Sequence, residues 1–495
     1  MIKNIKWLFL VSLTIVACSD DETVVVNNTS DGLPLTAGSA DFSNYVSLGN
    51  SLTAGYCDNA LFIEGQANSY PAILADQFAL VGGGEFKIPY TNDNTGGLLL
   101  GGNVIAGPRL YFNGAGPAPV TGIPTTEVST VLAGPFNNMG VPGAKSFHLL
   151  APGYGNVAGV ATGQANPYFV RFASSPSTTI LADAAAQDPT FFSLWIGNND
   201  VLGYATSGGS GTNQTGNFNP ATYGPNDITD PNVFANVYTA LVDGMTANGA
   251  QGVVANLPYV TTIPFFTTVP HNPVPLNAAT AAQLNAGFSA YNNGLLFAQS
   301  VGLLTADEVT RRTISFTAST TNRVVMVDSY LTNLAAYGIP SYRQATSEDL
   351  VVLPARSFIG TVVGGNPAQI NGVSVPLADN WILSKDEILE VKTATDAYNA
   401  TIQSIASAKG LAFVDANVLM TRVANGGITA DNFTVTSTYV TGGGFSLDGV
   451  HPGPRGYALI SNEFIKAINA TYGSNFKGVS LGSYRILYPQ NPDNF

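Results

Sequence analysis

Cysteine and histidine are scarce in this sequence. Its 495 residues include two cysteines, Cys18 and Cys57, and three histidines, His148, His271 and His451. Two cysteines do not provide a disulfide framework or a thiolate metal cluster. Three histidines leave little from which to build a multi-histidine metal site. The sequence therefore gives no indication of a metal centre.

Charged residues are also few. They make up 10% of the chain, whereas an average soluble protein has about 25%. The 19 basic and 32 acidic residues give a net charge of -13. This sign repels phosphate backbones and leaves no basic stripe for nucleic acid. Nucleic-acid binding is therefore not expected.

Long apolar runs are missing everywhere except at the N-terminus, so no other segment is expected to span a membrane. Residues 1–17 combine the basic Lys3 and Lys6 with an apolar stretch that ends at Ala17. A basic start followed by a short apolar run is typical of a signal peptide. We therefore expect residues 1–17 to direct export of the chain.

The residues that follow resemble the start of a bacterial lipoprotein. Thr14–Cys18 is similar to a lipobox, in which the cysteine is lipidated, and Ser19–Glu22 is similar to the acidic surface-export tag of Bacteroidetes lipoproteins. The alternative is an ordinary signal peptide with an incidental cysteine. The resemblance implies lipidation of Cys18, a flexible tether over residues 18–40, and an outer-membrane lipoprotein that is exposed at the surface or faces the periplasm.

The rest of the chain has the composition of a folded protein, since 45% of its residues are hydrophobic. Apolar runs of strand length alternate with amphipathic segments of helix length. This alternation predicts an α/β fold with a mostly parallel sheet that is covered on both faces. Strands are expected at 44–48, 191–196, 252–257, 323–327 and 411–414, and helices at 70–80, 233–247, 278–298, 385–408 and 457–470.

Four polar segments stand where this fold would place a ligand. In doubly wound sheets, ligands bind beyond the carboxyl ends of the strands. The segments are Gly49–Gly55, Asn138–Ala144, Gly197–Asp200 and Asp448–Pro452. Each of the first three segments, taken alone, could also be an ordinary turn or a helix N-cap. The fourth is more specific, because a carboxylate three residues before an imidazole can bond its Nδ1–H and fix its tautomer.

Taken together and in this order, the four segments resemble the SGNH hydrolases, also called the GDSL esterase/lipase family. The resemblance implies an α/β/α sandwich with a flavodoxin-like sheet. It also implies that Ser51 is the nucleophile, that His451 is the general base and then the general acid, and that Asp448 orients His451. The sequence departs from the family at Asn50, where the family has aspartate.

The same resemblance implies an oxyanion hole. Its donors would be the backbone N–H of Ser51, the backbone N–H of Gly143 and the side chain of Asn199. Gly140 is the alternative to Gly143, which fits the family spacing better. No metal or organic cofactor takes part in such a mechanism.

The domain that carries these residues is expected to span residues 41–495, with insertions near 82–135, 203–231 and 340–380. These insertions are candidates for a lid or a wall of the site. The apolar groups Leu98–Leu100 and Phe265–Phe266 fit an acyl pocket, and they fit a β-rich flap over the core equally well.

The resemblance implies a serine esterase or lipase whose partners are an acyl ester and, through the lipid anchor, a membrane. Two alternatives stay open. One is a carbohydrate esterase that removes acetyl groups from glycans, and the other is a non-catalytic surface binding protein on the same scaffold. The sequence does not determine the oligomeric state.

Overall fold

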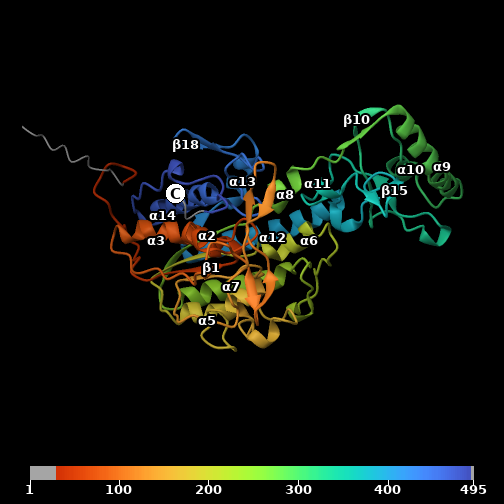
Figure 1. The fold of residues 1–495 in the computed structure, drawn as a ribbon. Helices are drawn as coiled ribbons and strands as arrows, with labels where there is room; N and C mark the ends of the chain where they lie inside the picture. The colour runs from red at the N-terminus through yellow and green to blue at the C-terminus, as the bar shows by residue number, and fades with distance from the viewer. Residues whose placement is uncertain (1–28, 492–495) are drawn as a thin grey trace, which may run out of the picture.

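A five-stranded parallel sheet forms the centre of the protein in the computed structural model, which describes residues 29–491 (Figure 1). Its strands, in spatial order, are β6 (Asn138–Gly140), β1 (Tyr45–Gly49), β7 (Phe191–Trp195), β8 (Gln251–Ala255) and β17 (Ala412–Val414). All four pairings are parallel. When the strands are numbered by their order in the chain, their spatial order is 2-1-3-4-5, which is the flavodoxin-like arrangement. The predicted α/β fold with a parallel, flavodoxin-like sheet is therefore confirmed.

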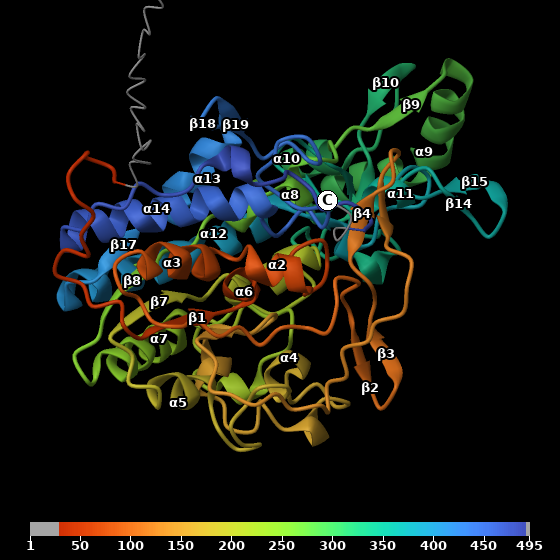
Figure 2. The same cartoon turned by 60° about the vertical axis from the view of Figure 1, so that its left-hand side comes forward.

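Helices cover both faces of the sheet, as Figures 1 and 2 show. One face carries α3 (Tyr70–Ala79) and α14 (Pro454–Tyr472), which pack on each other. The other carries α5 (Ile180–Ala185), α7 (Pro231–Thr246) and α12 (Lys385–Lys409). Every residue of β1 and β7 is buried, as a strand covered on both faces requires. The shorter helices of this body are α1 (Ser51–Ala54), α2 (Ile63–Ala67), α4 (Pro167–Val170), α6 (Asn199–Thr206), α8 (Pro264–Thr267) and α13 (Ala416–Ala424).

The order of the strands reverses at β1: β6 is added on one side of it, and β7 and the later strands are added on the other side. Gly49, its last residue, pairs with Gly140 on one side and Trp195 on the other. Connections leave a strand in opposite directions at such a point, so a crevice opens beyond its carboxyl end. Ser51 starts α1 at this position.

The largest insertion is longer than the sequence indicates. Residues 268–384 form a lobe that extends from the body in Figure 1, between β8 and α12. The predicted helix at 278–298 and strand at 323–327 form, but both belong to this lobe and neither joins the central fold. β11 (Val325–Val327) pairs antiparallel with β12 (Tyr342–Gln344) outside the central sheet. The prediction of a core strand at 323–327 was wrong because an apolar run of strand length does not show which sheet it joins.

Small antiparallel pairs build the insertions. In the lobe, the helices are α9 (Ala278–Ser300), α10 (Ala306–Arg312) and α11 (Ala355–Phe358), and the other strands are β9 (Val274–Leu276), β10 (Ser319–Asn322), β13 (Leu350–Val351), β14 (Val362–Val363), β15 (Asn366–Ile370) and β16 (Ile382–Leu383). Elsewhere, hairpins are formed by β2 (Leu98–Leu100) with β3 (Asn103–Ala106), β4 (Leu110–Phe112) with β5 (Pro117–Pro119), and β18 (Ile428–Ala430) with β19 (Phe433–Val435). Within residues 29–491, no helix combines the length and the apolar character that a membrane span requires.

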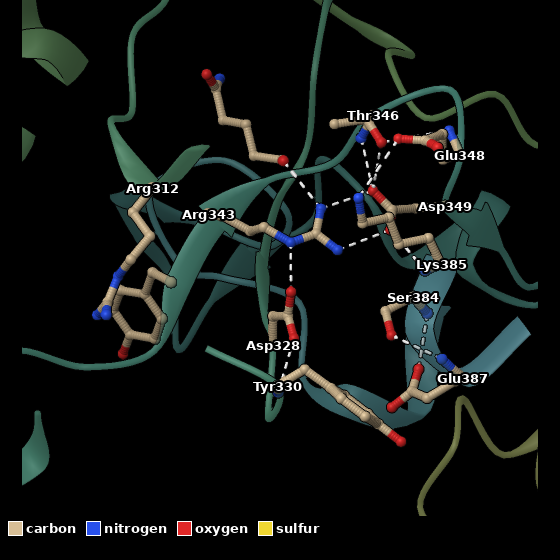
Figure 3. Close-up of polar contacts among 12 residues, drawn as sticks. Arg312, Asp328, Tyr330, Arg343, Thr346, Glu348, Asp349, Ser384, Lys385 and Glu387 are labelled. Carbon is tan, nitrogen blue, oxygen red and sulfur yellow. Dashed lines mark hydrogen bonds and ion pairs between the residues drawn. The ribbon is translucent and has the colours of Figure 1, made fainter. Parts of the chain in front are cut away.

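A buried charge cluster joins the lobe to the start of α12 (Figure 3). Arg343 pairs with Asp328 and binds both carboxylate oxygens of Asp349, at 2.6 and 2.7 Å. Asp349 also accepts a hydrogen bond from the backbone N–H of Lys385, the first residue of α12. All three charged side chains are at most 3% exposed. Because charges buried this deeply need partners, the cluster fixes where the lobe meets the helix.

The end of the expected tether packs against the body of the protein. Residues 1–28, which include the expected signal peptide and Cys18, lie outside the described residues. Residues 29–40, the second part of the expected tether, lie against the end of α14. The backbone N–H of Thr36 donates to Asn475, and that of Ser39 donates to the carbonyl of Tyr472.

Replacing Arg343 by methionine is expected to destabilise the protein by about 3–5 kcal/mol, because Asp328 and Asp349 would stay buried without a cation. Urea unfolding of the variant measures this change. The matched Arg311→Met variant, on an exposed position of α10, should stay within about 0.5 kcal/mol of the unmodified protein. Equal stabilities of the two variants would contradict the role given to the cluster.

Candidate active site

Three predicted residues from opposite ends of the chain meet beyond β1. The Oγ of Ser51 lies 2.9 Å from Nε2 of His451, and Nδ1 of His451 lies 2.9 Å from Oδ2 of Asp448. Ser51 and His451 are 400 positions apart in the sequence. Both contacts have hydrogen-bond length, so the three side chains form one continuous chain.

Local backbone chemistry sets the position of Ser51. Asn50 is the N-cap of α1, and its side-chain oxygen accepts a hydrogen bond from the N–H of Leu52. Ser51 is therefore the first residue of the helix and not its cap, so its hydroxyl is free to contact His451. Asparagine here performs the capping that the aspartate of the resembled family could also perform.

Backbone donors hold the Asp448 carboxylate in place. Its Oδ1 accepts hydrogen bonds from the N–H groups of Val450 and His451, and its Oδ2 accepts one from the N–H of Asn59. Burial raises the pKa of Asp448, but His451 and these donors outweigh burial and keep the pKa below its ordinary value. The carboxylate is thus ionised at neutral pH, as an acceptor for the imidazole N–H must be.

Gly449 allows the turn between Asp448 and His451 to fit against the rest of the site. Its φ is +72°, and a Cβ there would lie 2.9 Å from a side-chain carbon of Leu353 and 3.2 Å from the nitrogen of Phe265. The carbonyl of Gly449 accepts a hydrogen bond from Phe265 N–H. The insertion after β8 therefore braces the loop that carries His451, through α8 and the segment before α11.

Gly140, the last residue of β6, and Gly143, which follows the strand, have different surroundings. The N–H of Gly140 donates to the side chain of Asn138, and a Cβ at Gly140 would lie 2.3 Å from the nitrogen of Ala54. Gly140 thus serves close packing of α1 on β6. Gly143 has a φ of +80°, and a Cβ there would meet only Asn166, at 3.9 Å. Its N–H donates to no group within residues 29–491.

Asn199 lies beside the Gly143 segment. Its Nδ2 donates to the carbonyl of Ala144 at 2.9 Å. The next residue, Asp200, is fully buried and accepts hydrogen bonds from the N–H and the hydroxyl of Ser146. These contacts lock the segment after β6 to the start of α6. The structure therefore brings Ser51, Gly143 and Asn199 to neighbouring strand ends.

Sequence reasoning missed several residues next to this chain of contacts. The Tyr56 ring packs on the imidazole of His451 with 4.8 Å between centroids. Asn59 supplies a donor to Asp448, as described above. Asp58 is 1% exposed, and its Oδ2 has no hydrogen-bond partner among the described residues. All three follow Ser51 within one short loop, and only that proximity could have drawn attention to them.

In the described part of the chain, the remaining histidines and Cys57 make no hydrogen bond to Ser51, His451 or Asp448. His148 accepts a hydrogen bond from the N–H of Lys145 and stacks on Tyr154, and burial lowers its pKa to about 4. His271 lies in the lobe, where its carbonyl binds Val324 N–H. Cys57 is a free and buried thiol. Within residues 29–491, no three histidine, cysteine or acidic side chains are grouped to hold a metal ion.

An apolar cavity opens at Ser51 and His451. Its walls include Trp195, Leu419 and Val423, and Asn199 also contacts it. The triplet Leu98–Leu100 does not line this cavity, since it belongs to the β2–β3 hairpin and packs in a separate cluster with Val128 and Val170. Phe265–Phe266 does not line the cavity either. For both apolar groups the sequence left an acyl pocket and a β-rich flap open, and for Leu98–Leu100 the structure favours the flap.

Comparisons with known proteins give limited similarity. No family model matches the chain, and no curated protein sequence matches it. Among solved structures, it is similar to an acetyl-xylooligosaccharide esterase of Geobacillus stearothermophilus, with 10% identity, a TM-score of 0.31, and 87% and 96% of the two chains covered. It is also similar to an extracellular lipase of Streptomyces rimosus, with 13% identity, a TM-score of 0.28, and 87% and 99% covered. Scores this low assign neither fold nor activity.

Ionisation of Asp58 is expected to make stability depend on pH. Burial, with the nearby Asp448, raises its pKa from 3.8 to about 7 in the folded protein. Between these values the folded state holds a proton that the unfolded state has lost, so stability falls as pH rises from about 4 to 7. Full ionisation would cost up to about 4 kcal/mol.

The Asp58→Asn variant removes this ionisation. Its stability relative to the unmodified protein should therefore be higher at pH 7.5 than at pH 4.5, by a few kcal/mol, when both are unfolded with urea. A difference that is the same at both pH values would contradict the raised pKa.

Proposed function

We propose that the protein is a serine ester hydrolase that works through an acyl-enzyme. The observation that carries this proposal is the continuous chain from Ser51 Oγ through His451 to Asp448, with 2.9 Å at both contacts. A serine hydroxyl is a weak nucleophile until an adjacent base accepts its proton. His451 Nε2 is at the distance that this proton transfer requires.

In the proposed first step, Ser51 Oγ attacks the ester carbonyl while its proton passes to His451 Nε2. Asp448 accepts the Nδ1–H bond, fixes the tautomer and stabilises the imidazolium that forms. The alcohol then leaves with the proton from His451. Water, deprotonated by the same imidazole, then attacks the acyl-enzyme. The bond between the acyl carbon and Ser51 Oγ breaks, His451 returns the proton to Oγ, and the acid is released.

The negative oxygen of the tetrahedral intermediate needs donors that are already in place. We assign this role to the N–H groups of Ser51 and Gly143 and to Nδ2 of Asn199. Gly143 fits better than Gly140, because the N–H of Gly140 already donates to Asn138. The contact of Asn199 with the Ala144 carbonyl keeps its amide beside the Gly143 segment.

We also propose, from the sequence alone, that the protein acts at a bacterial membrane surface. This proposal rests on the similarity of Thr14–Cys18 to a lipobox and on the acidic residues that follow. Lipidation of Cys18 would place the ester hydrolase within reach of membrane lipids or surface glycans.

Hydrolysis of p-nitrophenyl butyrate by the purified protein tests the proposed function. Ser51→Ala and His451→Ala should each lower kcat/KM by at least about a thousandfold, because the nucleophile and its base act together and neither works without the other. His271→Ala, in the lobe, is the matched control and should retain activity. Circular dichroism checks that each variant folds. Activity that survives in folded Ser51→Ala would show that Ser51 is not the nucleophile.

A further inference from the structure

The cavity beside Ser51 is built almost entirely from apolar side chains. One wall is a full face of α13, on which Ala416, Leu419, Met420 and Val423 follow the i, i+3, i+4, i+7 spacing of a helix stripe. Facing residues come from α14, among them Leu459 and Ile460, and from the loop after β8, among them Val260 and Ile263. Sugar hydroxyls would find few partners on such walls.

The polar groups of the cavity belong to the site that holds Ser51 and His451. Besides these two and Asn199, the polar residues that line it are Asn50 and Asn198. The Nδ2 of Asn50 and the Oδ1 of Asn198 are buried without a hydrogen-bond partner among the described residues. Unsatisfied buried polar atoms are rare, and each needs an explanation such as a catalytic role or a bound water or ion. The cavity thus combines polar residues from the ends of β1 and β7 and His451 with walls that are otherwise apolar.

The cavity is too large to be a packing defect. The volume that the centre of a water molecule can occupy in it is about 100 Å³. By the same measure, a site for one water needs roughly 10–15 Å³. Water gains little there, because an apolar wall gives it no hydrogen bonds. An acetyl group attached to Ser51 would leave most of this apolar surface uncovered.

We propose that this cavity holds the acyl chain of the substrate, so that the protein prefers esters of medium-chain fatty acids to acetyl esters. The inference rests on the proposed ester hydrolysis at Ser51. From Ala416 to Val423 the wall is about 10 Å long. An extended chain advances about 1.2 Å per bond, so this length matches an acyl chain of about eight carbons.

The test compares kcat/KM of the purified protein for p-nitrophenyl acetate, butyrate and octanoate. We expect octanoate to exceed acetate by at least about tenfold, since each buried methylene contributes about 0.8 kcal/mol of transfer free energy. Hydrolysis that depends on Ser51 but does not favour octanoate over acetate would overturn the inference and leave the proposed function intact. No hydrolysis of any ester would overturn the proposed function itself.

A pair of variants on α13 tests whether this cavity sets the preference. Val423→Trp narrows the cavity and should lower the octanoate-to-acetate ratio at least tenfold. Val418→Trp places the same side chain on the outer face of the helix, where Val418 is 52% exposed, and should keep the unmodified ratio. Both esters are measured with the same preparation of a variant. Misfolded protein therefore lowers both activities equally and does not change the octanoate-to-acetate ratio. If Val423→Trp does not fold, Ile460→Trp on the opposite wall of the cavity provides the same test. An unchanged octanoate-to-acetate ratio in a folded cavity variant would show that the acyl chain does not bind in this cavity.

Discussion

The contact between Ser51 Oγ and His451 Nε2 joins the two ends of the folded chain, and much of the structure serves to make it possible. Ser51 is fixed by the turn after β1, at the point where the order of the strands reverses. His451 precedes α14, which packs on α3 and on the edge strand β17. The sandwich therefore determines the distance between two residues that are separated by nearly the whole sequence.

The insertions support this contact from outside the sheet. Within the 268–384 lobe, Arg343 is buried against Asp328 and Asp349. Asp349 in turn accepts a hydrogen bond from the backbone N–H of Lys385, which links the lobe to the start of α12. Just before the lobe, Phe265 binds the carbonyl of Gly449, and Leu353 N–H donates back to the carbonyl of Phe265. A segment inserted after β8 thus holds the turn between Asp448 and His451, which gives the insertion a structural role in the site.

Much of the fold and the central part of the site could be predicted from sequence. The run 191–196 formed a buried strand because its continuous apolar character suits a strand covered on both faces. The spacing of Asp448 and His451 was informative by itself, whereas Ser51 was assigned through the resemblance of the four segments to the SGNH hydrolases. β6 was missed because Asn138–Gly140 is three residues long and contains asparagine and glycine, which favour turns.

Other features depend on packing that a sequence pattern does not show. The stripe on α13 has the same spacing whether it faces a core or a cavity, so the sequence did not point to the cavity. The burial of Asp58 depends on the distant segments of Leu447 and Leu110, to which it is hydrogen-bonded. Helix α9 has the length of a core helix, but its neighbours belong to the lobe.

The most direct test of the account is to trap the proposed nucleophile with an alkyl fluorophosphonate and to locate the adduct by peptide mass spectrometry. The account predicts one adduct, on Ser51, whose formation is strongly slowed in the folded His451→Ala variant. Modification of a different residue, or ester hydrolysis that continues after Ser51 is fully modified, would contradict it.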